Sequence, residues 1–95
     1  MAIQQVFSVL SDKTRREILN LLKNGKMSAG DISSSLGIPA NTLSYHLKKL
    51  KSAELVYESK YKNYIFYELD MTILNEICLW IEELKGEKKS AKKIQ

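Results

Sequence analysis

The sequence is poor in the residues that build metal sites and disulfides, because it has one cysteine and one histidine among 95 residues. A lone cysteine cannot form an intramolecular disulfide and cannot by itself supply the roughly four ligands of a structural zinc site. A glycine-rich phosphate loop, a metal cluster and a set of nucleophile, histidine and carboxylate are also missing. The sequence therefore predicts a protein that is not an enzyme and that binds no metal and no cofactor.

Long apolar runs are missing as well. No stretch approaches the ~18 consecutive apolar residues of a membrane span, and the first residues, MAIQQVFSVLSDK, lack the basic segment and cleavage site of a signal peptide. We therefore expect a cytoplasmic protein without a membrane span. With 44% hydrophobic and 27% charged residues the chain has the composition of one small folded domain. Its core must be thin, so a core shared with a second copy would stabilise it.

The net charge of +4 is unevenly distributed along the chain. Residues 40–66 carry five basic and two acidic side chains, residues 67–87 carry one basic and six acidic ones, and residues 88–95 carry four lysines. Such asymmetry indicates a polyanion-binding surface apart from an acidic helix, and nucleic acid is the first polyanion to consider.

Apolar residues at helical spacing predict four helices in the first half of the chain. The first covers residues 3–10, and the second follows the N-cap candidates Ser11 and Asp12 and ends near Asn24-Gly25. The third runs from residue 28 or 29 to Gly37, and the fourth begins at Pro39 or Ala40. The last two are short helices joined by a glycine-containing turn, which is the pattern of a helix-turn-helix.

After residue 53 the pattern changes to that of strands. Residues 55–58 and 64–69 are rich in β-branched and aromatic side chains, and the polar residues 59–63 between them suit a turn. The helical period returns from Met71 and ends at Gly86. The predicted fold is mainly α with a small β-hairpin, a dimeric winged helix-turn-helix of order α-α-α-α-β-β-α. It comprises a domain at residues 1–86 and a disordered basic tail at residues 87–95.

The fourth predicted helix presents a polar face when Leu43, Leu47 and Leu50 point inward. Amide, hydroxyl and phenol groups can pair with base edges, while lysines neutralise phosphates. Together with the basic hairpin tip, which resembles a wing, this face gives the candidate DNA-binding residues: Asn41, Thr42, Ser44, Tyr45, His46, Lys48, Lys49, Lys60 and Lys62. His46 is expected at the helix edge in a peripheral role. A merely solvated helix face is the alternative.

Two further questions stay open at this point. Arg15 and Arg16 can contact phosphate or form surface ion pairs with carboxylates. Cys78 is expected to be a small core residue, because it lies within an apolar helix face.

The last predicted helix has an apolar face wider than a monomer core needs, and the first helix is similarly apolar. Both chain ends therefore predict a twofold interface between two copies. The candidate interface residues are Ile3, Val6, Phe7, Ile73, Ile77, Trp80, Ile81 and Leu84. The alternative is a last helix buried within its own domain.

Three runs of the sequence resemble one family: residues 11–19 (SDKTRREIL), 41–50 (NTLSYHLKKL) and 53–56 (AELV). They look like the ArsR family of winged-helix repressors, and the similarity covers roughly residues 2–84. Within that family the chain is most similar to the SdpR-like branch of small autorepressors. The resemblance implies a homodimer built from the first and last helices, a recognition helix at residues 39–51 and a wing at residues 55–69.

The chain also departs from the family pattern. Residues 27–32 hold no cysteine pair, and residues 74–78 hold none of the His and Asp ligands found in the last helix of many members. Metal sensing of those kinds is therefore not expected. Glu54 stands where the family often has glycine, so either it adopts a left-handed conformation or the helix before it ends differently.

Together these features predict a homodimeric repressor that places its recognition helices in the major groove of a near-palindromic DNA operator. Two other readings remain: a winged-helix module that binds proteins rather than DNA, and a repressor gated by oxidation of Cys78. An unidentified protein or small-molecule effector is left open as a further partner.

Overall fold

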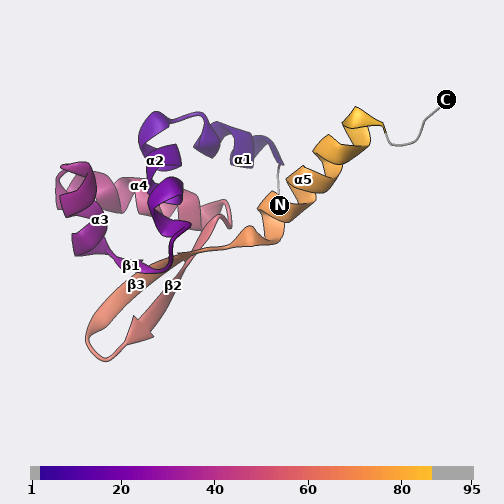
Figure 1. Ribbon diagram of the computed structural model, residues 1–95. Helices are drawn as coiled ribbons and strands as arrows, with labels where there is room; N and C mark the ends of the chain where they lie inside the picture. The colour runs from indigo at the N-terminus through magenta and orange to yellow at the C-terminus, as the bar shows by residue number, and fades with distance from the viewer. Residues whose placement is uncertain (1–2, 87–95) are drawn as a thin grey trace.

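The computed structural model describes residues 3–86, in which four helices and a very short strand precede a hairpin and a last helix (Figure 1). The elements are α1 (Ile3–Leu10), α2 (Lys13–Leu22), β1 (Met27–Ser28), α3 (Ala29–Leu36), α4 (Ala40–Ser52), β2 (Val56–Tyr61), β3 (Tyr64–Leu69) and α5 (Met71–Lys85). This order confirms the predicted winged helix-turn-helix. The predicted tail, residues 87–95, lies outside the described residues.

Side-chain caps mark where α2 and α3 begin. The Asp12 carboxylate accepts from the backbone N–H of Arg15 at 3.0 Å, and the Ser28 hydroxyl accepts from that of Asp31 at 3.1 Å. These bonds satisfy amides that have no partner within the first turn. At the other end of α3, Gly37 adopts a left-handed φ of 67°, which lets the chain turn sharply into α4.

The end of α4 answers the question raised by Glu54, which has a left-handed φ of 61°. The N–H of Leu55 donates to the carbonyl of Leu50 at 3.0 Å, and the N–H of Glu54 donates to that of Lys51 at 3.0 Å. This pair of bonds is the Schellman motif, in which glycine usually takes the left-handed position. The left-handed alternative is confirmed, and the motif directs the chain from α4 into β2.

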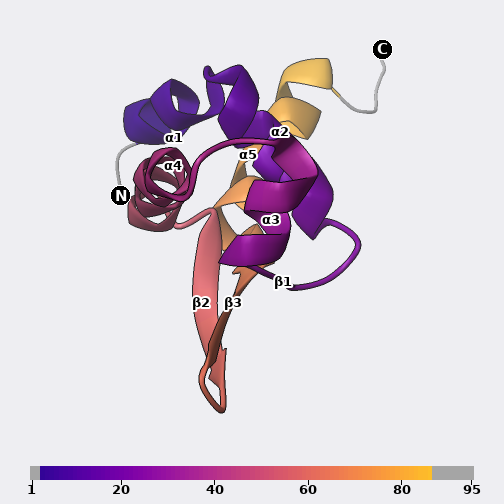
Figure 2. The same ribbon diagram turned by 90° about the vertical axis from the view of Figure 1, so that its left-hand side faces the viewer.

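The sheet has three antiparallel strands in the order β1-β3-β2. Its hairpin register runs from Val56 opposite Leu69 to Tyr61 opposite Tyr64. Two expectations need correction. The strand β1 was not predicted, because two residues are too short to show a strand period. The turn contains only Lys62 and Asn63 rather than residues 59–63, because the strands continue through the polar segment. Figure 2 shows the hairpin projecting well beyond the helices.

The core lies between the helices and the base of the sheet. Ile18, Ile32, Leu50 and Leu55 are completely buried, and Leu43 and Leu47 face inward as predicted. Burying one such side chain stabilises the fold by about 1.5–3 kcal/mol relative to leaving it exposed. Because α4 is fixed through its leucines, its opposite face is held outward. Among the described residues no helix is long and apolar enough to cross a membrane.

Candidate nucleic-acid interface

The outward face of α4 carries the predicted polar residues. Exposed side chains on this face are Asn41, Thr42, Ser44, Tyr45, Lys48 and Lys49. Tyr45 is 56% exposed, and the Lys49 ammonium lies 5.5 Å from the centre of its ring. This cation–π contact holds a positive charge beside the phenol. The face therefore offers hydroxyl, amide and ammonium groups on one rigid helix.

His46 is placed differently from its neighbours, because only 12% of its side chain is exposed. Its Nδ1 lies 3.3 Å from Nη1 of Arg15 and 4.0 Å from the Asp12 carboxylate. Since a guanidinium only donates hydrogen bonds, Nδ1 accepts and the proton of the neutral ring belongs on Nε2. His46 thus joins α4 to the start of α2, and its ring lies 5.4 Å from that of Tyr45, centroid to centroid, with the two planes 66° apart.

The two arginines of α2 are used within the fold. Arg15 Nε donates to the carbonyl of Val9 at 2.8 Å, and Arg16 Nη1 donates to those of Leu10 and Ser11 at 2.8 and 2.9 Å. These carbonyls lie at the end of α1, where the helix leaves acceptors without intrahelical donors. Both guanidinium groups therefore cap α1, a role that neither sequence-based alternative included.

The Asp12 carboxyl, which lies beside Arg15 and His46, has a lowered pKa. The hydrogen bond from the backbone of Arg15 is the main reason that the pKa of the Asp12 carboxyl lies below its ordinary value, and the charge of Arg15 lowers it further. The ionised carboxylate is thereby the form that caps α2.

The wing carries the other predicted lysines. Lys60 and Lys62 are exposed, and the Lys62 ammonium lies 5.4 Å from the ring centre of Tyr61. Lys26 was not among the residues predicted from the sequence. Its ammonium lies 5.2 Å from the ring centre of Phe66 on β3. The sequence could not indicate this position, because Lys26 precedes β1 and only the pairing of β1 with β3 brings Lys26 to the wing. The hairpin thus has lysines and exposed aromatic rings around its outer half.

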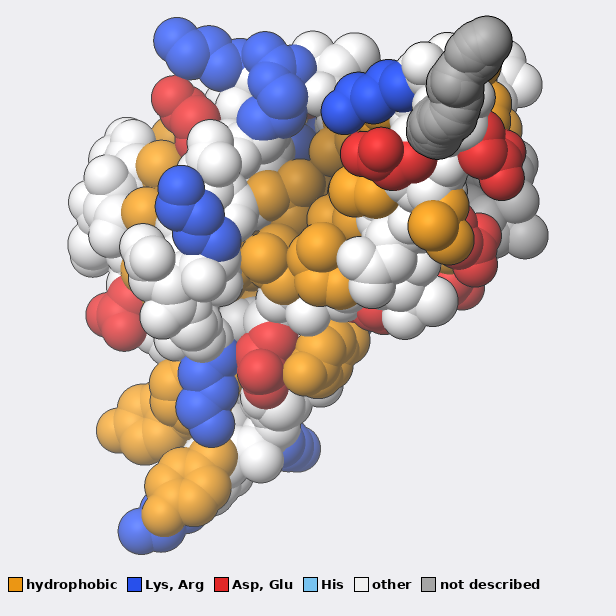
Figure 3. Space-filling view, turned by 45° about the vertical axis from the view of Figure 1, so that its right-hand side comes forward, with side chains coloured by type: hydrophobic (Ala, Val, Ile, Leu, Met, Phe, Trp, Pro, Cys, Tyr) orange, Lys and Arg blue, Asp and Glu red, His pale blue; other side chains and the backbone are white. Residues whose placement is uncertain are grey.

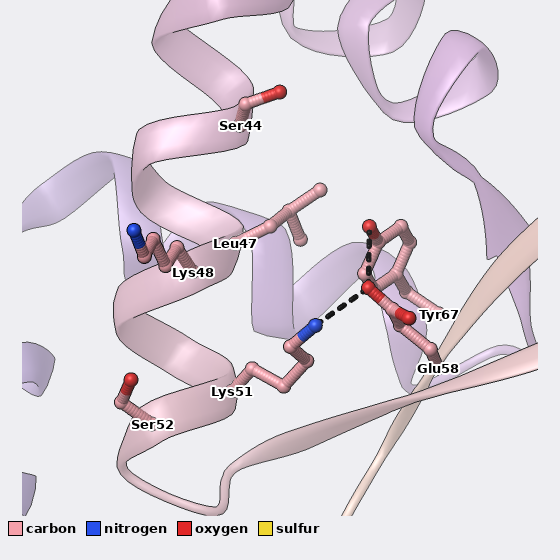
Figure 4. Close-up of a pocket in the computed structure, with 7 residues that line it drawn as sticks. All are labelled: Ser44, Leu47, Lys48, Lys51, Ser52, Glu58 and Tyr67. Carbon is pink, nitrogen blue, oxygen red and sulfur yellow. Dashed lines mark hydrogen bonds and ion pairs between the residues drawn. The ribbon is translucent and has the colours of Figure 1, made fainter.

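A groove of about 360 Å³ separates α4 from the wing (Figure 4). It is lined by Ser44, Leu47, Lys48, Lys51, Ser52, Glu58 and Tyr67. Lys51 Nζ reaches across it to Glu58 Oε2 at 2.7 Å, and the Tyr67 hydroxyl donates to the same oxygen at 3.3 Å.

The Lys51–Glu58 contact shifts both partners. The hydrogen bond from Lys51 lowers the pKa of the Glu58 carboxyl, and the same bond raises the pKa of the Lys51 ammonium. Burial and then the Glu58 charge raise the pKa of the Tyr67 hydroxyl. Lys51 was not among the predicted residues, although its i, i+4, i+7 spacing with Ser44 and Lys48 places it on their side of the helix.

At the other end of the molecule α1 and α5 share an apolar surface. The rings of Phe7 and Trp80 have centroids 6.2 Å apart, tilted by 55°. Ile3 is 51% exposed and Leu84 is 67% exposed, and Trp80 and Ile81 also keep nearly half of their surface open. Figure 3 shows hydrophobic side chains gathered on this side of the molecule beside carboxylates.

Three of the predicted interface residues are largely buried within their own protomer. Val6 is fully buried in the core of its own protomer, and Ile73 and Ile77 are each only 8% exposed. Ile73 and Ile77 still line a pocket in this surface together with Ile3 and Trp80. The expectation that Cys78 is a core residue was wrong, because its side chain is exposed. Within residues 3–86 no group of three or more His, Cys, Asp or Glu side chains could hold a metal ion.

Comparison with known proteins agrees with this architecture. Residues 12–58 match the model of the family described as bacterial regulatory protein, arsR family. The transcriptional repressor SdpR of Bacillus subtilis (strain 168) is 40% identical over 79 residues, which cover 83% of this chain and 88% of that protein.

Solved structures show the same fold. An ArsR-like transcriptional regulator from Rhodococcus sp. RHA1 has a TM-score of 0.81 and 30% identity, covering 87% of this chain and 76% of that one. A homodimeric winged helix-turn-helix DNA-binding domain from Mycobacterium bovis has a TM-score of 0.71 and 23% identity, covering 96% and 87%. The fold, the family match and the extensive similarity to SdpR together show that the chain belongs to the ArsR family of bacterial regulatory proteins.

Proposed function

We propose that this protein is a homodimeric autorepressor that acts in the cytoplasm on a near-palindromic operator in its own upstream DNA. Membership of the ArsR family makes it a DNA-binding transcriptional repressor rather than an enzyme. The observation that carries the proposal is the exposed polar and basic face of α4, held outward by a buried leucine stripe beside a basic wing.

Each group on this face has a proposed role. The amide, hydroxyl and phenol groups of α4 contact base edges or the DNA backbone, and the exposed lysines of α4 and the wing neutralise phosphates. The first set is Asn41, Thr42, Ser44 and Tyr45, and the second is Lys48, Lys49, Lys60 and Lys62. His46 acts at the periphery by holding Tyr45 and the start of α2 in place.

The second copy is proposed to pack against α1 and α5. Exposed Ile3, Phe7, Trp80, Ile81 and Leu84 supply an apolar surface there, and the Mycobacterium bovis domain of the same fold is homodimeric. A twofold dimer presents its recognition helices to successive major grooves about 34 Å apart, which is why the operator is expected to be nearly palindromic.

Alanine variants of Ser44 and Tyr45 test the assignment of the recognition helix. Loss of a base contact should cost about 1–3 kcal/mol of operator binding and should relax the preference for operator over scrambled DNA. Asn75→Ala is the control, because Asn75 is an exposed polar residue of α5. Unchanged affinity and sequence preference in both α4 variants would show that this face does not read the operator.

A further inference from the structure

A carboxylate stands in a groove that otherwise carries positive charge. Between α4 and the wing, the charged lining residues are Lys48, Lys51 and Glu58. Lys60 is also near enough to contribute to lowering the pKa of Glu58. A DNA phosphate entering this groove would be repelled by the Glu58 carboxylate and attracted by the lysines, so Glu58 needs an explanation.

The contacts of Glu58 divide between two elements. Tyr67, its direct cross-strand neighbour on β3, donates to Oε2 from within the wing. Lys51 donates to the same oxygen from the last turn of α4. The carboxylate thus keeps a partner within the wing when Lys51 leaves, whereas Lys51 is the partner able to turn toward another anion.

The Lys51–Glu58 pair is also weak enough to exchange. The side chains of Lys51 and Glu58 are 46% and 39% exposed, and water screens ion pairs in such surroundings, so they contribute little to stability. A phosphate that Lys48 also contacts has more than one donor. Such a phosphate can compete for Lys51 with one surface carboxylate.

We propose that Lys51 binds a phosphate of the DNA backbone. In the free protein Glu58 holds the Lys51 ammonium, and it releases this ammonium when DNA enters the groove. This inference rests on the proposed function and adds a residue pair that sets its strength. Because phosphate contacts carry no sequence information, Glu58 lowers binding to operator and to other DNA alike. The base contacts of α4 then make a larger share of the total affinity.

The test is Glu58→Gln, which removes the charge and keeps an oxygen acceptor for Tyr67. Affinity for operator and scrambled DNA should rise by the same factor, several-fold at low salt. The slope of log K against log salt concentration should stay close to the wild-type slope, because Lys51 neutralises a phosphate in both complexes. Glu68→Gln is the matched control, because Glu68 lies on the same hairpin but on its opposite face, bonded to Ser59.

A second variant separates a ligand from a general charge effect. Adding Lys51→Gln to Glu58→Gln should abolish the gain in affinity and make the salt slope shallower by up to about 0.9, the value of one phosphate that is no longer neutralised. If the double variant keeps the gain and the wild-type salt slope, or if Glu68→Gln raises the affinity equally, the proposal about Lys51 is wrong while the repressor function stands. If the wild-type protein shows no salt-dependent binding to DNA, the proposed function fails and this inference fails with it.

Discussion

Leu84→Ala should weaken the dimer without harming the protomer. Leu84 lies on α5 in line with Ile73, Ile77 and Trp80, at steps of three or four residues. It is 67% exposed in the isolated chain, so little of its side chain contributes to the protomer core. A partner that covers this face would bury most of what is open.

The size of the effect follows from the exposed fraction. Leu→Ala removes roughly three methyl or methylene groups at about 0.8 kcal/mol each. With 67% of the side chain available for burial, the loss is about 1.6 kcal/mol for each protomer. Because both protomers of a twofold dimer lose this free energy, the dissociation constant of the dimer should rise by about 200-fold. Sedimentation velocity over a range of protein concentrations measures this constant directly.

Leu79→Ala is the matched control for Leu84→Ala. Leu79 is 65% exposed on the same helix, but it lies five positions before Leu84, a step that turns it by about 140° to another face. Its variant should dimerise like the wild-type protein. Equal weakening by both variants, or no weakening by Leu84→Ala, would refute the placement of the interface on this side of α5.

Two predictions concern stability. Glu54→Gly should raise the free energy of unfolding in urea by about 0.5–1 kcal/mol. Glycine avoids the ~1–2 kcal/mol cost of the left-handed conformation, but part of this gain is offset because glycine loses more conformational entropy on folding. Glu54→Ala keeps the strain and should show no such gain; a similar gain would contradict the strain argument. Asp12→Asn should flatten the dependence of stability on pH in acid. The lowered pKa means that the ionised Asp12 contributes stability above about pH 4, which is lost as the pH falls through its folded-state pKa. Asparagine caps without titrating, so urea unfolding of the variant at pH 2–5 should fall less steeply; an equal fall would exclude Asp12 as a source of the acid sensitivity.

The helices were predictable because their signals are local. Leu43, Leu47 and Leu50 recur at helical spacing, and they are buried as that spacing requires. Asp12 and Gly37 act at helix ends through their own side-chain and backbone chemistry, so sequence position alone identified them. The outward face of α4 followed from the same periodicity.

What the sequence could not show depends on contacts between distant segments. The strand β1 has two residues and exists only through its pairing with β3. Arg15 and Arg16 looked like surface charges because the carbonyls they cap belong to α1. The bond between Lys51 and Glu58 requires the Schellman turn at Glu54 to bring β2 back beside α4, and that geometry is not visible in a residue pattern.

The most direct test of the central claim is a mobility shift of the purified protein on its own upstream DNA and on a scrambled duplex, at two salt concentrations. A sequence-specific homodimer should bind the upstream DNA selectively, with two protomers per site and a steep loss of affinity at the higher salt. Binding that is equal on the two duplexes, or that does not change with salt, would contradict an autorepressor that reads its operator through α4.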